Sequence, residues 1–422
     1  MLTVIILVFV IGYFFITLEH LVKINKTATA LLTGVLCWSL FIVSNSDPHS
    51  ISEKLAEHIG EIAGIIFFLM GAMTIVELID AHDGFEVIIS AISTNNKKKL
   101  IWIICIFSFF LSAILDNLTT TIVMVTLLRK LIADKKDRML FVGMVVIAAN
   151  AGGAWSPIGD VTTTMLWIGG QITTMNIIQN LILPSFICLI APLTVVSFML
   201  KGKADKPTTT DKKTKPLASP KDRNIIFFSG LGILLCVPIF KTITHLPPFM
   251  GMLLGLGLVW IISEFIHKDK DQADKDNYSV LHALQKIDMP SVLFFLGILI
   301  SISALQSTGQ LAQFASMMNE KIGNLNLIVL SIGLLSAIVD NVPLVAASMG
   351  MYDLQTYPTD HYFWQFLAYC AGTGGSTLII GSAAGVSAMG LEKIDFFWYL
   401  KKISWLALIG YLAGAVVYML FS

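Results

Sequence analysis

The sequence predicts an all-α polytopic membrane protein, an inverted-repeat assembly of about ten transmembrane helices, two re-entrant hairpins and two broken helices. Three observations predict this class. Hydrophobic residues make up 55% of the 422 residues and charged residues only 13%, a composition too apolar for a soluble domain. Apolar runs of membrane-spanning length recur along the whole chain. The phrase LSAILDN at Leu111–Asn117 returns as LSAIVDN at Leu335–Asn341, so the chain repeats itself.

Twelve apolar runs follow one another, at roughly 2–18, 28–45, 61–80, 101–128, 139–169, 176–200, 224–240, 249–266, 290–307, 325–351, 362–390 and 403–421. The first run is expected to be a retained span, because no basic flank precedes it and no small-residue cleavage site follows it. The five cysteines all fall within apolar runs and lack metal-ligand spacing. We therefore expect them to act as small hydrophobic residues without disulfides.

The fourth run, 101–128, is interrupted in its middle by Asp116 and Asn117. Basic residues flank both of its ends, in Lys97–Lys99 before the run and in Arg129–Arg138 after it. Cytoplasmic loops collect Lys and Arg, so both ends are expected on the cytoplasmic side. The run is therefore predicted to form a re-entrant hairpin with the Asp-Asn pair at its tip.

The tenth run, 325–351, contains the second pair, Asp340 and Asn341, and its flanks are mostly acidic. It is therefore predicted to enter from the opposite face. With this topology all but three of the 28 Lys and Arg residues lie in cytoplasmic loops, the exceptions being Lys54, Lys241 and Lys321. Both termini are then predicted to lie outside, in a bacterial-type cytoplasmic (inner) membrane that the chain crosses many times.

The repeat divides the chain into two halves, 1–200 and 224–422, joined by a polar segment at 201–223 that is expected to be a cytoplasmic linker. Each half contains three spans, a hairpin, a glycine-broken span and a final span. The odd number of crossings inverts the second half in the membrane, which is the plan of many secondary transporters. No phosphate-cradling Walker motif occurs, so an ion gradient is the expected energy source.

Polar residues interrupt the apolar runs at the hairpin tips and in the broken spans. An unpaired carboxylate in hydrocarbon is costly, so Asp116 and Asp340 are candidates for a functional site. In the fifth run, glycines and a proline are expected to unwind the helix just before Asp160, and the run 362–390 has a matching break. Freed carbonyls and Asn, Thr and Asp oxygens suit a small hard cation. The counterpart of Asp160 is Ser382, so the site should contain an odd carboxylate.

We expect Asp116, Asp340 and Asp160 to share one pocket. Burial and mutual repulsion favour their protonated forms, whereas a bound cation favours their ionised forms, so sodium and protons should compete. Simpler interpretations remain, since each aspartate can cap the following helix and glycine-rich breaks can be packing surfaces. Glu77 and Asp80, at the end of the third run, are expected to be interface residues without a transport role.

At these motifs the chain resembles the NhaD-type sodium/proton antiporters of the ion-transporter superfamily. The resemblance covers essentially the whole chain, and it is carried by LSAILDNLTTT, NAGGAWSPIGDVTTT, LSAIVDN and GTGGSTLIIGS in combination. It implies export of sodium and lithium in exchange for protons, by an elevator-like transport domain on a homodimeric scaffold. The chain departs from the superfamily plan by lacking an extra N-terminal span and by having Val342-Pro343 where the first tip has Leu118-Thr119.

The resemblance also implies which residues bind the cation and the proton. They are Asp116, Asn117, Thr119, Asn150, Asp160, Thr162, Thr163, Asp340, Asn341, Thr373, Ser376 and Thr377. The expected sodium-binding carboxylates are those of Asp116, Asp340 and Asp160. No cofactor is expected, and the expected partners are the lipid bilayer, Na⁺, Li⁺, H⁺ and a second copy of the chain.

Two other transporter classes remain open. Arsenite-type and P-protein-type permeases share the LDN tip and the PIGD break. Sodium-coupled dicarboxylate symporters of the same superfamily carry neutral Ser-Asn-Thr tips, and the three carboxylates here would repel a dianion. A channel fits inverted halves with broken helices less well. Zero net charge argues against nucleic-acid binding, and no catalytic constellation indicates an enzyme.

Overall fold

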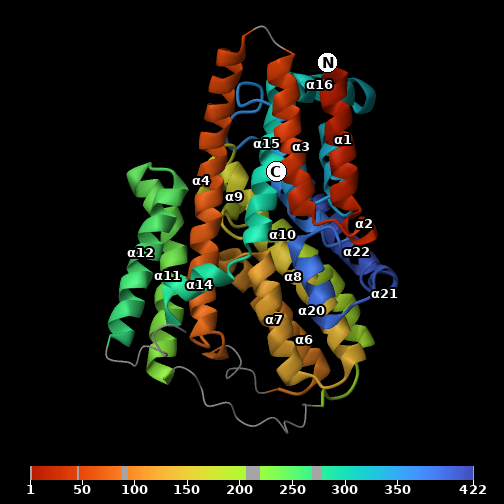
Figure 1. Cartoon of the computed structure of the whole chain (residues 1–422). Helices are drawn as coiled ribbons and strands as arrows, with labels where there is room; N and C mark the ends of the chain where they lie inside the picture. Colours follow the sequence, from red (N-terminus) through yellow and green to blue (C-terminus); the bar gives the residue numbers. More distant parts are fainter. Residues whose placement is uncertain (1, 45–46, 88–93, 206–218, 269–277, 422) are drawn as a thin grey trace.

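The computed structural model describes residues 2–44, 47–87, 94–205, 219–268 and 278–421, which are almost entirely helical (Figure 1). In the first half the helices are α1 (Leu2–Thr17), α2 (Glu19–Val22), α3 (Lys26–Val43), α4 (Pro48–Ala81), α6 (Lys97–Leu115), α7 (Asn117–Leu131), α8 (Lys135–Gly153), α9 (Val161–Ile168) and α10 (Thr174–Met199). In the second half they are α11 (Pro220–Thr244), α12 (Pro248–His267), α14 (Val280–Lys286), α15 (Met289–Ser307), α16 (Gln310–Ile322), α17 (Leu325–Leu335), α18 (Asn341–Met351), α19 (Tyr362–Gly374), α20 (Ala383–Glu392), α21 (Phe396–Lys402) and α22 (Ser404–Phe421). The chain is an all-α polytopic membrane protein.

Within the described ranges, eight helices are long and apolar enough to cross a membrane: α3, α4, α6, α10, α11, α12, α15 and α22. Three of the ten expected full spans lie outside this set. The helix α1 is too short, and the two broken runs are divided into the pairs α8 and α9 and α19 and α20. Conversely, α6 is long and apolar enough to cross a membrane, although it forms one arm of a hairpin.

The helices α6 and α7 form a hairpin that reverses at Asp116. Both of its open ends lie beside the segment that follows α10. The N–H of Lys97 donates to the carbonyl oxygen of Gly202 at 3.2 Å, and the N–H of Ala133 donates to that of Asp205 at 2.9 Å. Both open ends of the hairpin therefore lie on the same side of the molecule.

The loop that follows the second hairpin, α17 and α18, lies beside the start of α10. In the loop after α18, the carboxylate of Asp360 accepts hydrogen bonds from the N–H and the hydroxyl of Thr173, both at 2.7 Å, immediately before α10 begins. A 26-residue helix is about 39 Å long. The two hairpins therefore open toward opposite ends of the molecule.

Both broken helices lie against a hairpin through glycine. A Cβ on Gly152 would collide with the backbone of Phe109 in α6, and one on Gly374 would collide with the backbone of Gly333 in α17. The hydroxyl of Ser112 also donates to the carbonyl of Ala149 at 2.6 Å. Close backbone contact replaces side-chain packing here, which explains why glycines gather at the breaks.

The helices α1, α3, α4, α11, α12 and α15 form what we call the scaffold bundle, which occupies the upper and left parts of Figure 1. Within it, α3 and α15 meet closely, since a Cβ on Gly34 would lie 2.8 Å from the carbonyl oxygen of Gly297. Small residues at such crossings let membrane helices approach. We call the two hairpins, the two broken helices, α10 and α22 the core bundle.

Sequence patterning missed the short helices α2, α14, α16 and α21, because they are too short or too polar to form apolar runs. It also started the third span at residue 61, whereas α4 begins at Pro48. The carboxylate of Asp47 caps this helix by accepting from the N–H of Ser50 at 3.3 Å, so the polar first turns are helical too. Most of the expected linker at 201–223 lies outside the described residues, and α11 begins at Pro220.

Candidate functional site

The first hairpin tip has a strained backbone, and its aspartate is hydrogen-bonded within the same hairpin. Asp116 has a φ of 109°, a conformation that residues other than glycine rarely adopt. Its carboxylate caps α7 by accepting from the N–H of Thr119 at 2.7 Å and from the hydroxyl of Thr119 at 2.9 Å. The contacts of Asp116 are therefore those of a helix cap, as one of the simpler interpretations expected. The strained backbone lies at the point where the chain reverses between α6 and α7.

The carboxylate of Asp160 lies between the two hairpin tips and is 2% exposed. It accepts a hydrogen bond from Nδ2 of Asn117 at 2.8 Å, on the first tip. On the second tip, Nδ2 of Asn341 lies 3.3 Å from one of its oxygens and 3.5 Å from the other. The N–H of Thr162 donates to Asp160 at 3.0 Å and completes the cap of α9. One buried carboxylate thus joins both hairpins and a broken helix.

Asn150, near the end of α8, connects this group to the second broken helix. Its Oδ1 accepts from Asn117 at 3.0 Å, and its Nδ2 donates to the hydroxyls of Ser376 and Ser382, each at 2.9 Å. Ser382 caps α20 just as its counterpart Asp160 caps α9. The repeat therefore places the odd carboxylate and its neutral mate on the same network.

The second hairpin tip is held differently from the first. Asp340 caps α18, but the cap consists of one N–H, that of Val342, at 3.2 Å. Proline at position 343 has no N–H and no hydroxyl to replace those of Thr119. Instead, the ammonium of Lys26 lies 3.6 Å from Oδ2 of Asp340. This lysine belongs to the scaffold bundle and was counted with the cytoplasmic loops in the sequence analysis.

The remaining predicted residues lie around this group with mixed orientations. The hydroxyl of Thr163 donates to the carbonyl of Asp160 at 2.9 Å, and that of Thr373 donates to the carbonyl of Tyr369 at 2.6 Å. The hydroxyl of Thr377 is buried without a hydrogen-bond partner among the described residues. Hydrogen bonds therefore link Asn150 to Asn117, Asn117 to Asp160 and Asp160 to Asn341. The hydroxyls of Thr163 and Thr373 instead donate to backbone oxygens.

The three aspartates do not form a single ligand shell in this conformation. Asp116 and Asp340 are close enough to act electrostatically on Asp160, yet each is directed at the start of its own helix. In the described part of the chain, no three His, Cys, Asp or Glu side chains converge closely enough to hold a metal ion. A cation site around Asp160 would therefore also use amide, hydroxyl or backbone carbonyl oxygens.

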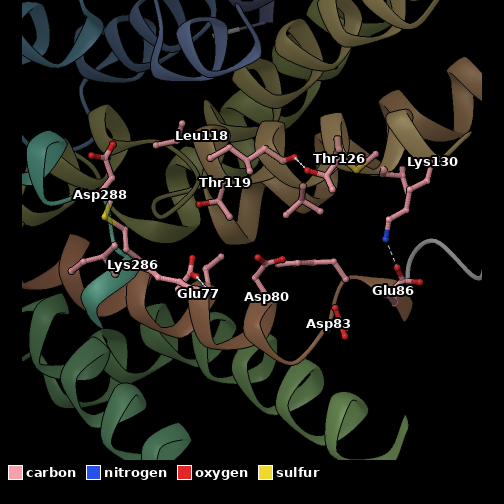
Figure 2. A pocket seen from close by; sticks show the side chains of 18 residues that line it. Glu77, Asp80, Asp83, Glu86, Leu118, Thr119, Thr126, Lys130, Lys286 and Asp288 are labelled. Carbon is pink, nitrogen blue, oxygen red and sulfur yellow. Dashed lines mark hydrogen bonds and ion pairs between the residues drawn. The ribbon is translucent and has the colours of Figure 1, made fainter. Parts of the chain in front are cut away.

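A cavity of about 290 Å³ leads to the first tip (Figure 2). One wall carries Glu77, Asp80 and Asp83, and the opposite wall carries Leu118 and Thr119. Its lining also includes Glu86, Lys130, Lys286 and Asp288. Glu77 and Asp80 were predicted to be interface residues without a transport role, and both line the cavity that reaches the tip. Acidic side chains therefore outnumber basic ones along this approach.

Sequence reasoning also missed Glu392, which is 3% exposed at the end of α20. Its carboxylate pairs with Nε of Arg129 at 3.0 Å and with Nε of Arg138 at 2.6 Å. These contacts join the end of the first hairpin and the start of α8 to the second broken helix. The signal available in the sequence was a single carboxylate just beyond an apolar run, followed directly by Lys393.

Comparison with known proteins gives a consistent assignment. A family model described as "Citrate transporter" matches residues 13–369. Sodium/proton antiporter 2 of Arabidopsis thaliana is 48% identical over 415 residues, which cover 98% of this chain and 98% of that protein. Sodium/proton antiporter 1 of the same plant is also 48% identical, over 98% of this chain and 71% of its own length. The Na⁺/H⁺ antiporter NhaD of Vibrio cholerae is 28% identical over 99% of this chain and 91% of its own.

The chain belongs to the NhaD-type sodium/proton antiporter family. Among solved structures, the YdaH transporter of Alcanivorax borkumensis has the same fold, with a TM-score of 0.61 and 10% identity over 94% of this chain and 98% of that one. In this NhaD-type chain, as the sequence analysis expected, the family motifs coincide with the hairpin tips and helix breaks.

Proposed function

We propose that this NhaD-type protein exports sodium, and lithium, in exchange for protons by alternating access. The observation that carries the proposal is Asp160, a buried carboxylate held between the two hairpin tips by Asn117 and Asn341. The relatives named sodium/proton antiporters, at 48% identity over nearly the whole chain, support the same assignment.

The chemistry of the site suits competition between a proton and a hard cation. An ionised Asp160 can ligate sodium, whereas a protonated one has lost most of its attraction for a cation. The side-chain amides of Asn117 and Asn341 present their Nδ2 groups to the carboxylate. Turning each amide about its last bond exchanges nitrogen for oxygen, and so provides carbonyl ligands at the same positions. The same side chains can then satisfy Asp160 with and without sodium.

Access is proposed to run along the acidic cavity between α4 and α7. The carboxylates of Glu77, Asp80 and Asp83 line its wall, and such clefts concentrate cations near their mouths. Thr119 lies where the cavity meets the first tip. We assign these three acidic residues to approach rather than to binding, and keep Asp116 and Asp340 with Asp160 as the carboxylates that serve sodium.

Movement is proposed to be elevator-like, with the core bundle moving against the scaffold bundle. Glu392 forms ion pairs with Arg129 and Arg138, and so joins the first hairpin and α8 to the second broken helix. Such links between the repeats are needed if the core bundle moves as one unit. The halves 1–200 and 224–422 are proposed to be inverted repeats joined by the residues 201–223. The protein is proposed to work as a homodimer in a bacterial-type inner membrane, with both termini outside.

The description of the family model as a citrate transporter raises a second candidate, uptake of a carboxylate anion. A citrate site needs free cations, and the described contacts of the site contain one, Lys26, which already faces Asp340. Asp116, Asp340 and Asp160 are three carboxylates, and together they would repel the anion. The charge distribution therefore favours a cation as substrate.

The test is exchange in inside-out vesicles that hold a proton gradient, with sodium, lithium, potassium, citrate and arsenite added in turn. Sodium and lithium should dissipate the gradient, and the other three should not. Transport of citrate or arsenite without a sodium response would contradict the proposal and would favour the corresponding permease class.

A further inference from the structure

The ion pair between Lys26 and Asp340 links the two bundles at the second hairpin tip. The ammonium lies 3.6 Å from the carboxylate, with the side chains 29% and 18% exposed respectively. This separation is longer than a charge-assisted hydrogen bond of about 2.8 Å, so the attraction is largely electrostatic. Asp340 immediately precedes Asn341, which contacts Asp160. A scaffold charge thus acts next to the centre of the proposed site.

Lys26 is fixed to the scaffold by several independent contacts. Its backbone N–H donates to the carboxylate of Glu19 at 3.1 Å, and its ammonium lies 4.3 Å from the ring centroid of Phe294 in α15. The neighbouring hydroxyl of Thr27 donates to the carbonyl of Pro290 at 2.9 Å. The lysine is therefore anchored independently of the second hairpin.

The position of Lys26 in its own helix offers no reason for a positive charge. It is the first residue of α3, where the helix dipole disfavours a cation. The carboxylate of Asp340 supplies the compensating charge. The pair is thus better explained by its effect on the tip than by the stability of α3.

The asymmetry between the two tips shows what this charge replaces. Asp116 is satisfied within its own hairpin by the N–H and the hydroxyl of Thr119, and among the described residues it has no ion pair. At the second tip Pro343 supplies neither donor, and Asp340 keeps only the N–H of Val342. The ammonium of Lys26 faces the Asp340 carboxylate in place of the two missing donors.

We propose that Lys26 is a positioning residue that acts as a tethered cation: it neutralises Asp340 while sodium is absent and holds the second hairpin against the scaffold. Sodium entering beside Asp160 takes over part of that neutralisation and frees the tip to move. Lys26 therefore competes with the transported cation through its charge beside Asp340. This inference rests on the proposed function, because it presumes a cation that binds next to Asp340.

The experiment measures sodium binding to purified protein through the sodium-dependent rise in melting temperature. Removing a competing partly exposed charge worth about 1 kcal/mol should lower the half-saturating sodium concentration about fivefold in Lys26→Gln. Lys26→Arg should restore the wild-type value. Lys23→Gln is the matched control, because Lys23 lies just before Lys26, between α2 and α3, and has no ion pair among the described residues. It should leave the half-saturating sodium concentration unchanged. In the Asp340→Asn background, Lys26→Gln should have no further effect on residual binding.

A second readout keeps the inference separate from the proposed function. In sodium-free buffer, the melting temperatures of Lys26→Gln, Asp340→Asn and the double variant should be non-additive, since both single changes remove one interaction. If wild-type protein shows no sodium-dependent stabilisation, the proposed function fails, and the tethered-cation role fails with it. If wild-type protein binds sodium but Lys26→Gln has equal or weaker affinity, only the competition by Lys26 is overturned.

Discussion

Replacing Asp160 by asparagine should separate the function of the site from its stability. The change keeps the size of the side chain and removes its charge. The donors that converge on the carboxylate come from Asn117 at 2.8 Å, Thr162 at 3.0 Å and Asn341 at 3.3 Å. An asparagine can accept through only one oxygen, so at least one of these donors would face the new NH₂ group.

The expected change in folding free energy is small because two effects oppose each other. Hydrogen bonds to a charged group contribute about 1.5–3 kcal/mol, and neutral ones about 0.5–1.5 kcal/mol, so each bond weakens by about 1 kcal/mol. Removing a buried charge also removes its desolvation penalty, which amounts to several kcal/mol. The melting temperature of Asp160→Asn should therefore stay within a few degrees of that of the wild type.

The expected change in sodium binding is large. Two unit charges 4 Å apart attract each other by about 4 kcal/mol at an effective dielectric constant of 20, which corresponds to about a thousandfold in affinity. Sodium added to weakly buffered wild-type protein should release protons, detected with a pH-sensitive dye. Asp160→Asn should release almost none.

The matched control is Asp353→Asn, which alters an exposed carboxylate that caps a loop through the N–H of Thr356 at 2.7 Å. This variant should release protons as the wild type does. A folded Asp160→Asn protein with near-normal release would refute the placement of the exchange site at Asp160.

Three further predictions follow from the same structure. Asp116→Asn and Asp340→Asn should abolish exchange in vesicles while the protein still inserts, and Glu77→Gln should only raise the sodium concentration needed for half-maximal rate; the reverse ranking would move the site into the acidic cavity. Single cysteines at Asn96 and Asp137 should react with an impermeant reagent only from the cytoplasm, and a cysteine at Thr356 should react only from outside. If the cysteines at Asn96 and Asp137 were labelled from opposite sides, the re-entrant hairpin would be ruled out. Glu392→Gln removes the charge that faces Arg129 and Arg138, whose side chains are 46% and 17% exposed, so it should lower the free energy of unfolding by about 1–2 kcal/mol, measured by thermal or denaturant melting. An unchanged stability would show that the core bundle does not depend on this cluster.

The sequence predicted where the helices are interrupted, because polar residues inside apolar runs have few structural explanations. The re-entrant course of the two hairpins through a membrane stays a prediction. Asp116 and Asp340 marked the reversals, and the glycines around Asn150 marked the break before Asp160. The convergence of Asn117, Asn150 and Asp160 was implied by the family resemblance and is seen as direct contacts.

Other features depend on tertiary packing, which local patterning does not report. Lys26 was counted as one more basic residue in a loop, and its contact with Asp340 joins segments from different halves of the chain. The positive φ of Asp116 arises because the chain must reverse within one residue, and composition carries no signal for it. Glu77 and Asp80 lie near the end of α4, so their role on a cavity wall becomes visible only when α7 packs opposite.

The central claim is that sodium and protons compete for the carboxylate of Asp160, and the most direct test is the pH dependence of sodium affinity. Calorimetric titration of purified protein with sodium should be repeated across the pH range in which the protein stays folded. If each sodium ion displaces one proton, the apparent affinity should fall by about tenfold for each unit of decreasing pH once the site is mostly protonated. A sodium affinity that does not change with pH would contradict shared ligands and would require the proton to travel through other groups.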